Sequence, residues 1–142
     1  MTKTAGSFST PCYCINSRRA TNALTAHYDK ALAACGLSVG QFSLLRNLDA
    51  MGGSNVTALA DRVGLERTTV VRNLKPLTEG GFIQDSVEAS GRERRLLVTA
   101  KGKAALAKGI PLWKQAQKDV REAIGPEHMD MFRAVMAALQ GL

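Results

Sequence analysis

The sequence predicts a mainly α-helical protein with one small β-hairpin, and three observations support this fold class. Apolar residues recur at three- and four-residue spacing over most of the 142 residues. Glycines interrupt this periodicity at positions 36, 52–53, 64 and 80–81. Between 82 and 99 the pattern changes to two short β-prone runs around a Ser-Gly turn. We therefore expect four helices, a hairpin and two further helices.

The first expected helix covers residues 12–34, which contain no proline or glycine and directly follow Pro11. Its apolar residues form one stripe that stops before Gly36, a residue type that commonly ends helices. The stripe consists of Ala20, Leu24, Tyr28, Ala31 and Cys35. Because three- and four-residue spacing places side chains on one face, this helix has one side to bury.

The second expected helix has a clear start signal. Ser38 and Gln41 have the spacing of a capping box, in which each side chain accepts a hydrogen bond from the other residue's backbone N–H. Leu37 and Phe42 stand where the two residues of a hydrophobic staple would pack together. We expect this helix to begin after Ser38 and to end at the glycine pair 52–53.

Two shorter helices should follow. The segment VTALADRVG, residues 56–64, predicts a third helix with Thr57 as its N-cap and Gly64 as its stop. The segment LERTTVVRNLKPLTEGG, residues 65–81, predicts a fourth. On it, the side chains expected to pack inward are Val70, Val71, Leu74 and Leu77, and those expected to point outward are Thr68, Thr69, Arg72 and Asn73.

Residues 82–87 and 95–99 are the two strands of the expected hairpin. The intervening EASGRER segment predicts a polar, basic turn, with Arg92, Arg94 and Arg95 clustered at its tip. Thr99 can then cap a long helix that contains an internal proline, Pro111, which should kink or split it.

Gly125-Pro126 opens the last expected helix, whose apolar side is Met129, Phe132, Val135, Met136 and Leu139. Residues 38–99 form a compact block that can cover the apolar stripes of the flanking helices only in part. A second copy of the chain is the expected cover, which predicts a homodimer.

Composition narrows the classes of partner and compartment. The net charge is +7 and the isoelectric point is near 9.7, which suits an anionic partner such as nucleic acid. The N-terminus has no apolar signal stretch and no apolar run is long enough for a membrane span, so we expect a cytoplasmic protein with no membrane partner. Three cysteines without an export signal favour reduced thiols over a disulfide framework.

The element order, with a basic hairpin after two short helices and a longer one, is that of a winged helix-turn-helix. The outward face of the fourth helix carries small hydroxyls for close approach and a guanidinium for phosphate or guanine, as entry into a DNA major groove requires. An arginine on the hairpin tip can reach the minor groove or its flanking phosphates. A protein- or RNA-interaction module is the alternative from another class.

The stretches LERTTVVRNLKPLTEGGFI and SGRERRLLVTAKGKAAL resemble the DNA-binding lobe of the MarR family of bacterial transcription regulators. The resemblance extends over nearly the whole chain. In the wing, the family pattern Asp-x-Arg followed by Leu-Thr-x-x-Gly has its counterpart in Ser90-Gly91-Arg92 and residues 98–102. The resemblance implies a single domain over residues 1–142, with a winged helix-turn-helix lobe at 38–99 and dimerisation helices at 11–36 and 100–142.

The resemblance also implies a homodimer on a pseudo-palindromic double-stranded DNA site, usually a repressor that is released by a small ligand or by oxidation. It makes Arg92 the DNA contact at the wing tip. The expected DNA-binding residues are Arg67, Thr68, Thr69, Arg72, Asn73, Arg92 and Arg94. Two positions depart from the family pattern. Ser90 replaces an aspartate that steadies the wing, and Glu66 replaces an aspartate that would cap the recognition helix better.

By the same resemblance, a ligand would bind where the dimerisation helices meet the winged lobe. His27, Tyr28, Phe42 and Trp113 are the candidate walls, and a small aromatic or phenolic compound is the candidate ligand. The alternative is that Phe42 and Trp113 are core residues. The sequence contains no CxxC, HExxH, GxSxG or phosphate-binding glycine loop, so we expect no enzyme activity, no metal site and no cofactor.

Cys12 and Cys14 are the candidate redox residues. On a helix, two residues two positions apart diverge by about 200°, so the pair should not bridge and at least one should face inward. The segment CYCINSRRA resembles a MarR subgroup with a Cys-x-Cys-x-Asn first helix. More loosely, Cys14 and Tyr28 have the spacing of the reactive cysteine and a tyrosine in the organic-peroxide-sensing OhrR branch, but Arg18 stands where that branch has a second tyrosine. Neighbouring Arg18 and Arg19, and the positive end of the helix, would favour the thiolate that a sensor needs. The alternative is that both cysteines are small apolar residues packed in the dimer interface.

Overall fold

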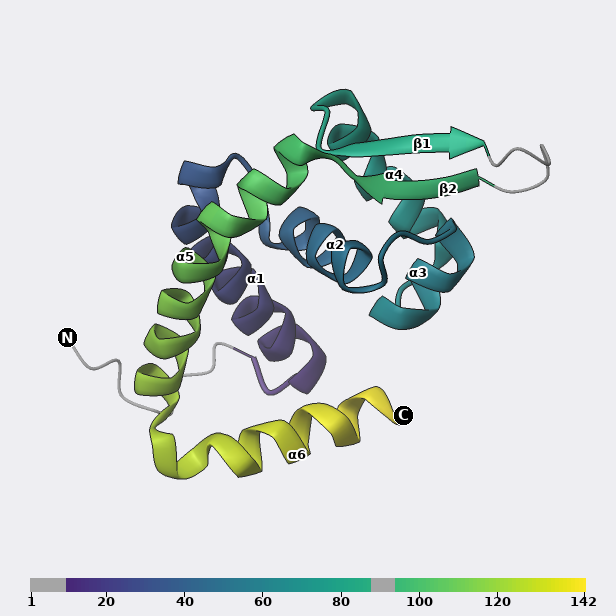
Figure 1. Ribbon diagram of the computed structural model, residues 1–142. Coiled ribbons are helices and arrows are strands. Elements are labelled where there is room, and N and C mark those ends of the chain that lie inside the picture. The colour runs from purple at the N-terminus through teal and green to yellow at the C-terminus, as the bar shows by residue number, and fades with distance from the viewer. Residues whose placement is uncertain (1–9, 88–93) are drawn as a thin grey trace.

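The computed structural model describes residues 10–87 and 94–142, and it confirms the expected mainly helical fold with one antiparallel hairpin (Figure 1). In chain order the elements are α1 (Tyr13–Leu32), α2 (Val39–Ala50), α3 (Val56–Val63), α4 (Arg67–Glu79), β1 (Ile83–Val87), β2 (Arg94–Val98), α5 (Ala100–Ile124) and α6 (Met129–Gln140). Short 3₁₀ turns at Ala33–Cys35 and Pro126–His128 follow α1 and precede α6. No helix in the described ranges is long and apolar enough to cross a membrane.

Helix α2 lies at the centre of the core, in contact with α1, α3, α4, α5 and β2. Its Leu45 and Leu48 are fully buried, and Leu32 of α1, Leu59 of α3 and Val70 of α4 pack into the same cluster. Burying one such side chain stabilises a fold by about 1.5–3 kcal/mol. This core holds α3, α4 and the hairpin as one unit.

Local start and stop signals are confirmed at several helix ends. The Ser38 hydroxyl accepts from the Gln41 backbone N–H (3.2 Å), and the Gln41 side chain accepts from the Ser38 N–H (3.0 Å), which completes the capping box. Thr99 caps α5 by accepting from the Gly102 N–H at 3.1 Å. Gly64 ends α3 with a φ of 69°, a left-handed conformation that glycine adopts without steric cost.

Two expectations about the helices are wrong in detail. Asn55, and not Thr57, is the N-cap of α3, because its side-chain oxygen accepts from the Ala58 N–H at 2.8 Å. Val71 does not pack inward with its neighbour Val70, since 50% of its surface is exposed. Of the two outcomes expected at Pro111, a kink or a split, the split does not occur: α5 continues as one helix and bends along its length (Figure 1).

The flanking helices keep apolar side chains exposed. The stripe on α1 is buried only towards its C-terminal end, where Cys35 is enclosed, whereas Ala20 is exposed. Helix α6 has no buried residue and lies along the lower edge of the molecule, away from α2, α3 and α4 (Figure 1). Its exposed apolar side chains include Met131, Val135, Met136 and Leu139.

Candidate nucleic-acid interface

The N-terminal half of α4 presents a basic and hydroxyl-bearing surface. Arg67, Thr68 and Arg72 are exposed, as expected, whereas Thr69 and Asn73 are half-buried at the edge of that surface. Lys75, also exposed, extends the basic surface by one turn and makes a 4.0 Å contact with Glu79. Glu66 stands at the N-cap without a side-chain hydrogen bond to the backbone, so the first N–H groups of α4 remain open to a partner.

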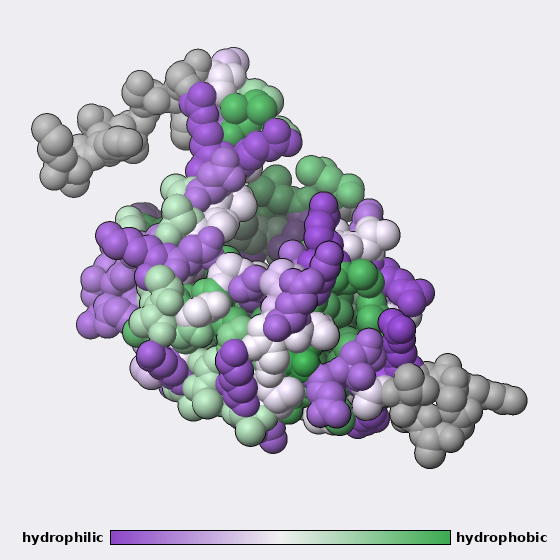
Figure 2. All heavy atoms as spheres, turned by 90° about the horizontal axis from the view of Figure 1, so that it is seen from above, coloured by the Kyte–Doolittle hydropathy of each residue, from purple (hydrophilic) through white to green (hydrophobic). Residues whose placement is uncertain are grey.

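A groove of about 840 Å³ lies between α4, the start of α3 and the hairpin. Its apolar lining consists of Val56, Val71, Leu74 and Leu96, and its charged lining consists of Arg67, Arg72, Lys75, Glu79, Asp85 and Arg94. In the space-filling view, hydrophilic side chains project from the hairpin end of the molecule, with hydrophobic ones exposed between them (Figure 2). The groove therefore combines cations at the surface with an apolar interior.

The hairpin is held in place from its base. Its strands pair antiparallel with Ile83 opposite Val98 and Asp85 opposite Leu96, and Ser54 adds a backbone bridge to Leu96. Arg94 lies 3.6 Å from the Asp85 carboxylate. The expected DNA contact of Arg92 and the expected effect of Ser90 on the wing concern residues that lie outside the described ranges.

Arg95 has a different place from the one expected. Its guanidinium donates to the Gly52 carbonyl at 3.0 Å, so the side chain reaches back to the turn after α2 instead of joining a basic tip. A side chain in β2 alternates in direction with its neighbours, which separates Arg95 from Arg94. Arg95 therefore fastens the hairpin to the core.

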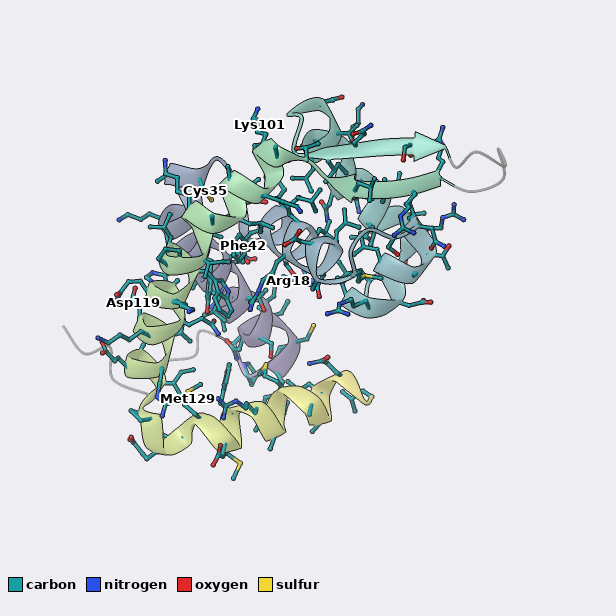
Figure 3. All side chains as sticks on the ribbon, in the orientation of Figure 1. Arg18, Cys35, Phe42, Lys101, Asp119 and Met129 are labelled. Atoms are coloured by element: carbon teal, nitrogen blue, oxygen red, sulfur yellow. The ribbon has the colours of Figure 1, made fainter. Side chains whose placement is uncertain are left out.

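A second fastening joins the hairpin to α5. The Thr99 hydroxyl donates to the Gly81 carbonyl (2.6 Å), and the Thr99 backbone N–H donates to the Phe82 carbonyl (3.0 Å). Gly102 lies against this joint, because a β carbon there would stand 2.2 Å from the Phe82 carbonyl oxygen. Lys101 donates to the Gly80 carbonyl and lies 4.8 Å from the Phe82 ring centroid (Figure 3). These contacts explain the Thr-x-x-Gly spacing: Thr99 makes the hydrogen bonds of the joint, and Gly102 leaves room for the Phe82 carbonyl.

A smaller cavity of about 310 Å³ lies between α1, α2 and α5. Of the four expected wall residues it brings together Tyr28, Phe42 and Trp113. Phe42 points into the space between the helices (Figure 3) and stacks on Trp113 with ring centroids 6.3 Å apart. Sequence reasoning missed Arg46, whose guanidinium lies 4.4 Å from the Trp113 ring centroid and provides a positive charge in the wall. Its position one turn after Phe42 on α2 was the available signal.

His27 does not line the cavity. It makes a 2.9 Å contact with Asp119 across the outside of α1 and α5, next to the hydrogen bond that Tyr28 donates to Gln117. Hydrogen bonds from Gln115 and His27 lower the pKa of Asp119, whereas burial raises the pKa of Tyr28. Tyr28 therefore keeps its phenolic proton near neutral pH, and the two contacts join α1 to α5.

Both N-terminal cysteines are exposed, which corrects the expectation that one faces inward. Helix α1 begins at Tyr13, so Cys12 is its N-cap residue and lies outside the regular helix, where the 200° argument does not apply. The third cysteine, Cys35, is buried and donates to the Leu32 carbonyl at 3.0 Å.

Comparison with known proteins agrees with this geometry. The model of the MarR family matches residues 37–86, which contain α2, α3, α4 and most of β1. The DNA-bound structure of the Mycobacterium tuberculosis transcriptional regulator MosR is 36% identical to the chain, with a TM-score of 0.76. The match covers 92% of this chain and 97% of MosR. The chain belongs to the MarR family.

Two structures of another regulator resemble this MarR-family chain. The transcriptional repressor CouR, bound to a 23-mer DNA duplex, is 27% identical with a TM-score of 0.79, covering 91% of this chain and 92% of that one. CouR bound to p-coumaroyl-CoA is 25% identical with a TM-score of 0.82, covering 97% of both chains. No curated protein sequence matches the chain significantly. From the family match and the similarity to MosR, this MarR-family chain is a transcriptional regulator with a winged-helix fold.

Proposed function

We propose that the chain is a homodimeric repressor that binds a pseudo-palindromic DNA site through α4 and the hairpin and is released by a small ligand. The exposed basic surface of α4, formed by Arg67, Thr68, Arg72 and Lys75, carries this proposal. The solved complexes of MosR and CouR with DNA support it, because their chains share this fold over nearly their full length.

The exposed apolar faces of α1 and α6 support the homodimer. Tyr13 and Met131 are 88% and 68% exposed, and α6 has no buried residue along its length. Exposed apolar residues gathered on two terminal helices cost free energy in water, and a second copy of the same chain removes that cost. Two copies of α4 would then face two half-sites of the DNA.

The DNA-binding proposal is tested by the salt dependence of affinity. Removing one phosphate contact lowers the slope of log K against log salt by about one per half-site. We expect this change for Arg72→Ala and, at the wing tip, for Arg92→Ala. Lys118→Ala is the matched control, since Lys118 is exposed on α5 and its ammonium group lies 3.9 Å from the Glu122 carboxylate in the same helix.

The outcomes separate the candidate classes. Equal slopes in the wild type and Arg72→Ala would remove α4 from the interface. Failure of the wild type to bind any double-stranded DNA would favour the protein- or RNA-interaction module. A reduced slope in Lys118→Ala as well would show that net charge, and not the α4 surface, determines affinity.

The cavity between α1, α2 and α5 supports release by an aromatic ligand. Half-buried Trp113 lines the cavity with the buried Phe42 ring stacked against it, and Arg46 offers a cation to a carboxylate or phenolate. Trp113 is the single tryptophan of the chain, so its fluorescence reports on this cavity alone. We expect benzoates and phenols to quench it and to release DNA, and Arg46→Gln to weaken benzoates more than neutral phenols. Quenching without release would refute the regulatory role.

A second candidate function is thiol-based oxidation sensing, favoured by the exposure of Cys12 and Cys14. A hydroperoxide would oxidise one thiol to a sulfenic acid with loss of the alcohol or water. A second thiol would then displace water from the sulfenic acid to form a disulfide. The resemblance to the Cys-x-Cys-x-Asn subgroup and to the peroxide-sensing branch belongs to this second proposal.

Peroxide treatment followed by a DNA-binding assay tests this second function. We expect wild type to lose affinity, and Cys14→Ser and Cys12→Ser to lose less. Cys35→Ser is the control, because Cys35 is buried. Equal responses of all four proteins would exclude the two exposed cysteines as the switch.

A further inference from the structure

Val71 stands out on α4 because it is apolar and half exposed. All of α4 lies within the described residues, and Val71 is its one large hydrophobic residue with a strongly exposed side chain: 50% of its surface is accessible to solvent. The core beneath it is already filled by Val70, Leu74 and Leu77, each nearly fully buried. Valine is also a poorer helix former than alanine or lysine. Neither core packing nor helix propensity accounts for this residue.

The surroundings of Val71 are those of a contact surface for an anionic polymer. Arg67, Val71 and Lys75 follow one another at four-residue spacing and form one row along α4. All three line the groove between α4 and the hairpin, together with Arg94. The row thus has a cation at each end and an apolar side chain between them.

This arrangement matches the chemistry of a DNA major groove. Cations at the two ends of the row suit phosphates, and with both cations on phosphates the residue between them would face base edges. Valine has no hydrogen-bond donor or acceptor on its side chain, and the apolar group on a base edge in that groove is the C5-methyl group of thymine. We propose that Val71 is a specificity-determining residue that reads one thymine in each half-site through its methyl group. This inference rests on the proposed DNA-binding function.

Replacement of thymine by deoxyuridine tests the inference, since it removes the methyl group and leaves base pairing unchanged. The probe is the duplex that the wild-type protein enriches from a randomised library, with each thymine replaced in turn in both half-sites. At one symmetry-related position we expect wild-type affinity to fall about fourfold per half-site, which corresponds to one methyl group removed from a buried contact. Both half-sites together then give a loss of roughly fifteenfold.

Two variants separate a reading role from a structural one. Val71→Ala should bind the thymine and uracil duplexes equally, and thermal unfolding at wild-type temperature or above would show that it folds. Leu65→Ala is the matched control, because Leu65 is also apolar and 45% exposed but precedes α4 and does not line the groove. It should keep the full penalty for uracil.

Each contrary outcome has a defined meaning. If no thymine carries a penalty in the wild type, or if Val71→Ala keeps the wild-type penalty, the assignment of Val71 is overturned while DNA binding stands. If the wild type enriches no duplex at all, the proposed function fails and this inference fails with it.

Discussion

Replacement of Gly102 by alanine should destabilise the protein although alanine is the better helix former. The new β carbon would lie 2.2 Å from the Phe82 carbonyl oxygen and 2.7 Å from a Val98 methyl carbon. Non-bonded carbon–oxygen contacts in proteins lie near ~3.3–3.6 Å. The carbonyl belongs to the backbone and accepts from the Thr99 N–H, so no side-chain rotation relieves the overlap.

The expected magnitude follows from three terms. Overpacking costs about 1–3 kcal/mol, and displacing the Phe82 carbonyl from its Thr99 donor costs about 1 kcal/mol. Replacing glycine in a helix returns about 1 kcal/mol. The net free energy of unfolding should fall by about 2 kcal/mol, which corresponds to a Tm lower by about 8 °C for a chain of this size.

The assay is thermal unfolding followed by far-ultraviolet circular dichroism at equal protein concentrations, because the Tm of a dimer depends on concentration. Gly40→Ala is the matched control. Gly40 also lies in a first helical turn, in α2, and a β carbon there meets nothing within 4 Å. It should raise the Tm by about 2–4 °C. A Gly102→Ala protein that melts at or above the wild-type temperature would refute the argument, as would equal losses in both variants.

Three further predictions concern the hairpin, the core and the acid limb of stability. Arg95→Ala should change the Tm little, since the side chain is exposed. It should weaken DNA binding several-fold in a mobility-shift assay, because the hairpin loses its hydrogen bond to Gly52. Unchanged affinity would contradict this prediction. Leu59→Ala should cost about 2–5 kcal/mol in denaturant unfolding, because the side chain is fully buried, and a loss under about 1 kcal/mol would speak against the packing described. The pKa of Asp119 is lowered first by the hydrogen bond from Gln115 and then by the contact with His27, so these contacts contribute stability above the ordinary carboxyl pKa and lose it as the pH falls. Asp119→Asn should therefore show a smaller drop in Tm than the wild type between about pH 5 and about pH 3, and parallel curves would refute the assignment.

Short-range signals predicted most of the fold. The capping box of Ser38 and Gln41, the left-handed Gly64 and the Thr99 cap each depend on backbone groups within four residues, so the sequence around them specifies their geometry. The expectation failed where two local candidates competed. Asn55 and Thr57 are both acceptable N-caps, and the course of the chain after Gly53 selected Asn55.

The candidate site was predictable as a surface but not residue by residue. The residue types of α4 indicate a DNA-binding face, yet neighbouring Val70 and Val71 differ by 100° on the helix, and periodicity could not decide where the buried arc ends. The partners of Arg95 and Arg46 lie far from them in the sequence, and no spacing rule predicts these contacts.

The sequence by itself determined the order of elements, most of the helix ends, the basic surface of α4 and the resemblance to the MarR family, because each depends on residue type and local spacing. The tertiary structure alone decided that Arg94 lines the groove whereas Arg95 fastens the hairpin, that Val71 borders the groove, and that Cys12 and Cys14 are exposed. These properties are set by what packs against each side chain from elsewhere in the chain, and burial is a property of the assembled fold.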